Sequence, residues 1–390
     1  MRSRSRSPVA VALALSAAML AAGCASAIPA ARPADTRAAL SAPSLATSLA
    51  TAAGTWAVAV MGGSAAQHNN FWQLFARPAG SASWQLVTPP GVPDNGGLVL
   101  ARLGGRSLIT GFRPSQHLTY TPLAATSDGG RQWSSVSPLD AALANVPDAL
   151  AAAPGTGQLL ALLINGTATL ARPGYTSWST LATRRSLAAT PPGQRCGLQS
   201  LTAAAYSPSG VPLIGGTCGH PGTAGILAQT GGTWHAAGPA LPASLARQPV
   251  RVLRLTSTAH RTVALLAAGA GPATSLLAAW SPDSGSHWAT SPPYHLNGAT
   301  LRSASFGPGS TAAIVLTGSR GETIAGPAAS WQPLPSLPPG TATLAPGPAG
   351  GFDALAVDRT TLNVWQLVPR SAAWARTQLI SVPVQFGSSS

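Results

Sequence analysis

The chain contains no lysine and only nine acidic residues, against 23 arginines in 390 positions. Without lysine, the usual phosphate-binding loop is excluded, because its lysine must reach the nucleotide phosphates. The formal charge of +14 would otherwise suggest a nucleic acid or an acidic surface as partner. The arginines are scattered, however, without a basic run or interleaved aromatic residues. We therefore expect no nucleic-acid partner, and anionic polymers of a cell envelope are more compatible with this charge.

Long apolar runs are also missing, apart from one near the N-terminus. Arg2, Arg4 and Arg6 precede an apolar run from Val9 to Ala22. The run is too short for a stable transmembrane span, and its pattern is typical of a bacterial export signal. We therefore expect the rest of the chain to be exported whole.

The end of this signal, from Leu20 to Cys24, resembles the lipobox of bacterial lipoproteins. The resemblance implies that residues 1–23 are a lipoprotein signal peptide, that Cys24 is acylated, and that the protein is anchored on the outer face of the cytoplasmic membrane. The alternative is cleavage after Ala27 and free secretion. Residues 24–54 are mostly Ala, Pro, Ser and Thr, which predicts a disordered tether.

Cysteine is scarce in the rest of the chain, where Cys196 and Cys218 are the two remaining residues of this type. In an exported protein such an isolated pair indicates a disulfide. The two positions lie almost opposite each other when counted outward from a turn near Pro208. The pair lacks the close spacing of a redox-active motif.

Seven tryptophans recur at intervals of roughly one four-stranded propeller blade. They are Trp84, Trp133, Trp178, Trp234, Trp288, Trp331 and Trp374. Short apolar segments separated by Gly- and Pro-rich turns fill the intervals, which predicts strands and argues against helices. The predicted fold is all-β: a single β-propeller over residues 55–386, with seven four-stranded blades.

The first blade is expected to lack its innermost strand, because only three strand-like segments precede the second repeat near Gly97. The segment from Ser381 to Phe386 continues past the last tryptophan. We expect it to complete the first blade and so to protect both sheet edges of the ring.

Two repeats carry a sharper motif, S/T-x-D-x-G-x-x-W. It is formed by Asp128, Gly130 and Trp133 in one repeat and by Asp283, Gly285 and Trp288 in another. The motif resembles the Asp-box, or BNR repeat, of sialidase-like propellers. The aspartate can accept hydrogen bonds from the N–H groups of its own turn, the glycine allows a positive φ, and the tryptophan packs between sheets. We interpret these residues as structural.

A sialidase-like site would also require an arginine triad, an acid, and a tyrosine nucleophile paired with a glutamate. Glu322 is the single glutamate of the chain, and tyrosine occurs four times. The seven histidines show no spacing typical of metal ligands, so no metal and no cofactor are predicted. No catalytic residues are assigned.

The predicted function is that of a lipid-anchored, monomeric propeller of the cell envelope, which binds a glycan or a protein through its central face without catalysis. A sialidase-like glycoside hydrolase and an envelope assembly factor are the alternatives. Arg254 and Arg302 occupy roughly matching places in two consecutive repeats, so they are candidate ligand-binding residues that could attract an anion near the axis. The alternative is that arginine is simply common in this chain and that the two residues share no site.

Overall fold

The computed structural model describes residues 45–62, 70–89, 97–104, 107–112, 123–135, 147–258, 260–327, 329–347 and 350–383. The predicted signal peptide, Cys24 and the tether up to residue 44 lie outside the described residues, as do residues 384–386 of the predicted C-terminal segment.

The described strands form seven successive antiparallel meanders of four. The first three meanders comprise β1 (Ser48–Thr51), β2 (Gly54–Gly62), β3 (Asn70–Pro78) and β4 (Gln85–Leu86); β5 (Leu98–Gly104), β6 (Ser107–Phe112), β7 (Leu123–Thr126) and β8 (Ser134–Ser135); and β9 (Pro147–Ala152), β10 (Leu159–Leu163), β11 (Thr167–Ala171) and β12 (Ser179–Thr183).

The other four comprise β13 (Leu198–Tyr206), β14 (Pro212–Cys218), β15 (Ile226–Thr230) and β16 (Thr233–Ala236); β17 (Val250–Ser257), β18 (Thr262–Ala268), β19 (Ser275–Ser281) and β20 (Ala289–Thr290); β22 (Leu301–Phe306), β23 (Ala312–Leu316), β24 (Arg320–Ile324) and β25 (Gln332–Pro333); and β26 (Thr341–Pro346), β27 (Phe352–Asp358), β28 (Thr361–Leu367) and β29 (Ala375–Ser381). The short strand β21 (Tyr294–His295) adds to β19.

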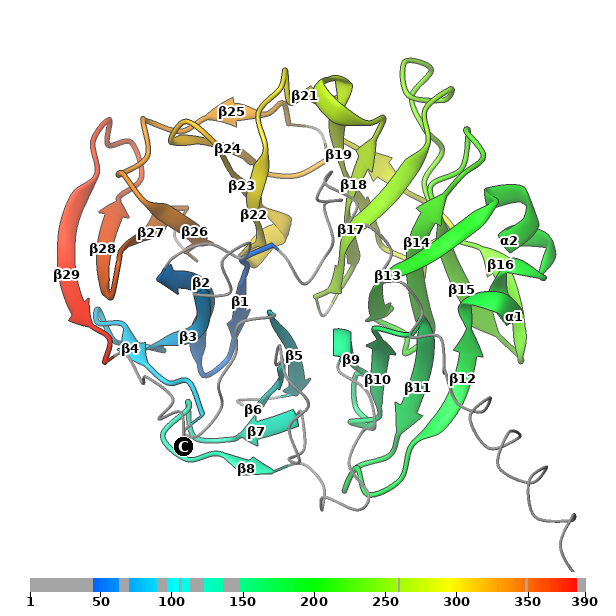
Figure 1. Cartoon of the computed structure of the whole chain (residues 1–390), viewed down its shortest axis with the longest axis horizontal. Coiled ribbons are helices and arrows are strands. Elements are labelled where there is room, and N and C mark those ends of the chain that lie inside the picture. Colours follow the sequence, from blue (N-terminus) through cyan, green and yellow to red (C-terminus); the bar gives the residue numbers. More distant parts are fainter. Residues whose placement is uncertain are drawn as a thin grey trace, which may run out of the picture. The chain divides into compact units, whose positions relative to one another are not determined.

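In the described part of the chain, hydrogen bonds join these meanders into five sheets, because two of the sheets each contain two meanders. The all-β propeller fold predicted from the sequence is therefore present, whereas the count of seven separate blades stays a prediction. In Figure 1 the first strands of the meanders lie toward the middle of the view, and fourth strands such as β8, β12 and β29 lie outside.

The second strands of the meanders are mostly apolar and buried. In β10, β18 and β23 every residue is buried, including those on both faces of the strand. Such continuous apolar runs are typical of strands that are covered on both sides. Each meander is therefore packed between two neighbours.

Seven apolar clusters fill the spaces between consecutive meanders in the part of the chain that the structure describes. Each cluster combines buried residues of two successive meanders, and one of them joins the last meander to the first through Leu355 and Val364 on one side and Phe75 on the other. The meanders therefore form a closed succession.

The recurring tryptophans lie at corresponding places in this succession. All seven stand at the start of a fourth strand and pack into the cluster shared with the preceding meander. Trp133 and Trp288 donate their Nε1–H to the carbonyl oxygens of Val87 and Ala237, both at 2.8 Å, just beyond the preceding fourth strand. The indole thus fixes one meander against the next by packing and by a hydrogen bond.

The junction between the last and the first meander uses polar side chains in addition to its apolar cluster. Asp353 of β27 forms an ion pair with Arg77 and accepts a hydrogen bond from Nε1 of Trp84 at 3.0 Å. Gln378 of β29 bonds both the N–H and the carbonyl oxygen of Trp84, at 2.8 Å each. Burial raises the pKa of Asp353, and the charge of Arg77 acts against this shift without offsetting it.

The first meander corrects two expectations from the sequence. Its innermost strand is present and is β1, which pairs with β2 over Ser48 to Thr51. Residues 45–54, which were assigned to the disordered tether, therefore belong to the folded domain. Ser381, expected to begin a strand that completes the first blade, instead ends β29 of the last meander, where it pairs with Thr361.

Two short helices, α1 (Arg184–Ala188) and α2 (Pro191–Cys196), connect β12 to β13 and were not predicted. Thr183 and Thr190 cap their N-termini, and Gly197 ends α2 at a φ of 59°. None of the described helices is long and apolar enough to cross a membrane. Cys196 at the end of α2 forms a disulfide with Cys218 at the end of β14, so the bond ties the helical connection to the second strand of its meander.

We predict that Asp353→Asn lowers the free energy of unfolding by about 3 kcal/mol, because Arg77 loses the counter-charge with which it is buried. Urea unfolding followed by tryptophan fluorescence measures the change. Asp358→Asn is the control, since Asp358 is exposed at the end of the same strand. Equal stability of the two variants would show that this ion pair does not hold the junction together.

Candidate functional site

A cavity of about 740 Å³ lies among the first strands of the meanders. Residues of β1, β5, β9, β13 and β17 line it, together with the turns that join first strands to second strands, among them Pro154, Thr258 and Pro308. Its volume is within the range typical of small-molecule and peptide sites. It is larger than a second pocket of about 280 Å³, which is lined by residues of the sixth and seventh meanders.

Small side chains leave this space open. The lining includes Ala101, Ala149, Ala151, Ala203 and Ala205, each on a first strand. The side chains of these alanines also belong to, or pack against, the apolar clusters between neighbouring meanders, so the first strands themselves border the cavity. The alanine-rich first strands therefore create a mostly apolar hollow.

The N-terminal segment Leu45–Thr51 forms one wall of this cavity. Leu45 is buried in the cluster between the fifth and sixth meanders, and Ala46 pairs in parallel with Ser303. Thr47 donates its hydroxyl to the carbonyl oxygen of Ala304 at 2.8 Å, and Ser48 donates its N–H to the hydroxyl of Ser305 at 2.9 Å. Figure 1 shows β1 beside β22, far from it in the sequence.

Two arginines hold this segment from different meanders. Nη2 of Arg102 on β5 donates to the carbonyl oxygen of Ala50, and Nη2 of Arg254 on β17 donates to that of Leu45. Both arginines line the cavity, and the Nε atom of each is buried without a hydrogen-bond partner among the described residues. Burial lowers the pKa of both, that of Arg254 to about 10, so both remain charged at neutral pH.

Arg302 does not join Arg254 in the structure. Its side chain is exposed and is not among the cavity-lining residues, although its carbonyl oxygen accepts a hydrogen bond from Ala46 N–H at 3.2 Å. The cause is that each of the two strands contains a β-bulge, at positions that do not correspond. Leu253 is the unpaired residue of β17, whereas Arg302 itself is the unpaired residue of β22. Arg254 therefore corresponds to Ser303.

Arg102 was not identified from the sequence. It lies in the second repeat, whereas the two arginines predicted to match, Arg254 and Arg302, lie in the fifth and the sixth. An arginine in an Ala- and Leu-rich first strand, Leu98–Gly104, was the available signal.

The two Asp-box turns lie at the far side of their meanders from the cavity, between the third and fourth strands. Oδ1 of Asp128 accepts the N–H groups of Arg131 and Gln132, both at 3.0 Å, and Oδ1 of Asp283 accepts that of His287 at 2.8 Å. The imidazole of His287 and then its backbone N–H lower the pKa of Asp283, and the backbone bond from Gln132 is the largest cause of the lowered pKa of Asp128.

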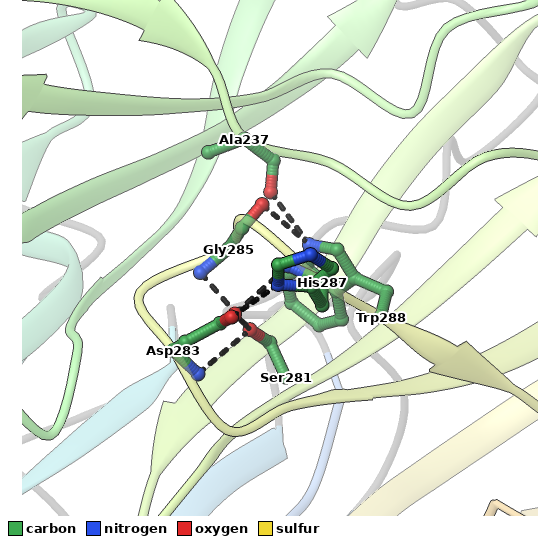
Figure 2. A network of polar contacts seen from close by, with 6 residues as sticks. All are labelled: Ala237, Ser281, Asp283, Gly285, His287 and Trp288. Atoms are coloured by element: carbon green, nitrogen blue, oxygen red, sulfur yellow. Dashed lines mark hydrogen bonds and ion pairs between the residues drawn. The ribbon is translucent and has the colours of Figure 1, made fainter.

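The hydroxyl that precedes each aspartate is the buried part of the turn. Ser281 Oγ accepts the N–H groups of Asp283 at 3.3 Å and Gly285 at 3.0 Å, and donates to Asp283 Oδ1 at 3.1 Å (Figure 2). Gly130 and Gly285 have φ values of 89° and 92°. A Cβ at Gly285 would lie 2.6 Å from the carbonyl oxygen of Ala237, so glycine also permits the close approach of the preceding meander.

Glu322 forms a cluster with Tyr294 away from the cavity. The Tyr294 hydroxyl donates to Oε1 of Glu322 at 2.9 Å and accepts from Nη2 of Arg320 at 2.8 Å. Burial, and to a smaller extent Glu322, raises the pKa of Tyr294. Neither residue of this pair lines the central cavity.

Among the described residues, no group of three or more His, Cys, Asp or Glu side chains is placed to hold a metal ion. The titratable lining of the cavity consists of three arginines, Asp148, Tyr206 and His260. Asp148 has an interaction of its own. The arrangement favours binding of a negatively charged group over acid and base chemistry.

No family model and no curated protein matches the chain. Solved propeller structures do. YCF48 from Cyanidioschyzon merolae is 13% identical, with 85% of this chain and 97% of that chain covered and a TM-score of 0.51. The GH74 xyloglucanase from Xanthomonas campestris is 11% identical, with 84% and 52% covered and a TM-score of 0.51. YCF48 bound to D1 peptide is 14% identical, with 76% and 82% covered and a TM-score of 0.42. At these identities the likeness shows the β-propeller fold alone.

We predict that Ser281→Ala lowers the free energy of unfolding by about 1 to 3 kcal/mol, because two backbone N–H groups lose their buried acceptor. The exposed Ser286 of the same turn provides the control, Ser286→Ala. Chemical denaturation of both variants gives the comparison. A Ser281→Ala variant as stable as this control would contradict a structural role for the turn.

Proposed function

We propose that the protein is a non-catalytic binding module of the cell envelope and that its ligand occupies the central cavity. The observation that carries this proposal is the cavity itself, an alanine-lined hollow with the charged heads of Arg102 and Arg254 in its wall. Propeller ligands commonly occupy the central region, and the volume suits a ligand of moderate size.

The envelope location in this proposal rests on the N-terminal sequence. The apolar run and the lipobox-like end at Cys24 favour export and lipid anchoring. The disulfide between Cys196 and Cys218 is compatible with an oxidising compartment outside the cytoplasm. On this proposal Cys24 holds the folded domain at the outer face of the cytoplasmic membrane.

We further propose that the meanders are Asp-box repeats. The two complete motifs have the same hydrogen-bond pattern, in which the hydroxyl of Thr126 or Ser281 and the carboxylate of the following aspartate bind N–H groups of one turn. Since both turns lie away from the cavity, their role in this proposal is to shape the fold.

Filling the cavity should abolish binding. Ala149 is half-buried in the cavity wall and packs against the apolar cluster between the third and fourth meanders, so we predict that Ala149→Trp removes binding to solubilised envelope fractions even below its own, lowered unfolding midpoint. Ala372→Trp is the matched control at an exposed position of the last meander. Pull-down and thermal unfolding measure the two properties.

Unchanged envelope binding by the Ala149→Trp variant would overturn the proposed use of the cavity. Turnover of glycoside substrates by the unaltered protein, lost in the same variant, would favour the hydrolase over the binding module.

The anchoring is tested separately by Cys24→Ala. We predict that the unaltered protein partitions into the detergent phase and labels with radioactive palmitate, whereas the variant remains unprocessed or enters the aqueous phase. A native protein that begins at Ile28 and carries no lipid would show free secretion instead.

A further inference from the structure

We infer that the ligand of the central cavity is an extended acidic peptide, and that Arg102 and Arg254 bind its carboxylate groups. This inference rests on the proposed function, because it names the ligand class of the same cavity. Three features of the structure carry it: the two guanidinium groups, the segment they already hold, and the free edges of the neighbouring strands.

The guanidinium groups have donors left over. Each arginine donates one Nη2–H to a carbonyl oxygen of the segment Leu45–Thr51. The Nε atom of each is buried and has no hydrogen-bond partner in the described part of the chain. A buried cation without an anion costs folding free energy. A carboxylate entering the cavity would lie beside these guanidinium groups and offset that cost by its negative charge.

The charge of the lining has the matching sign. The charged lining consists of three arginines, Arg102, Arg254 and Arg261, and one aspartate, Asp148, which has an interaction of its own. Mostly apolar walls strengthen the electrostatic attraction between these arginines and an anion relative to open water. An acidic ligand is therefore favoured over a neutral one.

The segment Leu45–Thr51 shows that this cavity accommodates peptide backbone. Its carbonyl oxygens at Leu45 and Ala50 are the acceptors for the two arginines, and it pairs with both β2 and β22. The strands and arginines around the cavity thus bind an extended segment through its main-chain groups. Main-chain hydrogen bonds are also used when a peptide adds to a sheet edge.

Further edges face the same cavity. Among the described strands, β5, β9 and β13 each pair with a single strand, the second of their own meander. Residues of all three line the cavity, including Leu100, Ala151 and Ala204. Unpaired N–H and C=O groups along such edges can form hydrogen bonds with the backbone of an extended peptide. A compact anion has no row of backbone groups that could pair with them.

The test uses two synthetic peptides with the length of Leu45–Thr51. One alternates alanine with aspartate, which places the carboxylates on one side of an extended chain, and the other carries asparagine in place of aspartate. Calorimetry on the full folded protein should give about tenfold or more tighter binding of the aspartate peptide, since hydrogen bonds to charged groups are involved. This preference should decrease with added salt.

The variants Arg102→Met and Arg254→Met should each remove most of the preference for the aspartate peptide. Arg376→Met is the matched control, because Arg376 is exposed on the outermost strand β29. The comparison of the two peptides and the salt series require only the unaltered protein, so they decide the question even where a variant folds poorly.

Equal affinity for both peptides, or binding of neither, would overturn the inference. Binding of oligogalacturonate with the same dependence on both arginines, without binding of the aspartate peptide, would also overturn it and would assign the cavity to anionic glycans. If envelope binding is lost in Ala149→Trp but kept in both arginine variants, the acidic-peptide inference fails while the use of the cavity stands.

Discussion

The packing of one indole between each pair of consecutive meanders is the interaction on which the structure depends. A four-stranded meander alone has two apolar faces, and neither can remain exposed to water. The tryptophan at the start of each fourth strand covers the face of the preceding meander, as Trp133 and Trp288 do. Its position at the periphery leaves the first strands free to vary, which is why a cavity can exist at the centre.

Closure of the succession uses a different chemistry from its other junctions. Six of the tryptophans belong to a junction between meanders that follow each other in the chain, whereas Trp84 packs against the last meander, far away in sequence. There the indole N–H binds the carboxylate of Asp353 in place of a backbone carbonyl. A charged acceptor forms a stronger hydrogen bond than a neutral one, which suits a junction without chain connectivity.

The sequence predicted the fold well because its strongest signal, the spacing of tryptophans, comes from the residues that pack between meanders. Residues such as Asp128 and Asp283 could also be placed, since a turn motif is local. The strand β1 was missed because Ser48 to Thr51 has the same small residues as the sequence before it. Its stability comes from pairing with β2 and β22, which no local pattern reveals.

The candidate site was harder to predict than the fold. A single bulged residue, Leu253 in one strand and Arg302 in another, decides which side chain enters the cavity, and neither position has a distinctive composition. Strand side chains alternate between faces, so one unpaired residue exchanges the buried and exposed sets. Arg102 could be connected with Arg254 only once the segment between them was placed.

The position of β1 also determines how the domain responds to mechanical force. A load applied to the chain at Leu45, along the direction of β1, would act on its hydrogen bonds with β2 and β22 in parallel, so that several bonds must break together. A load applied to a peripheral strand such as β29, perpendicular to its direction, would separate its bonds one at a time. A force that pulls on the N-terminal side of the domain is therefore resisted by the hydrogen bonds of β1 and is distributed over the first and sixth meanders.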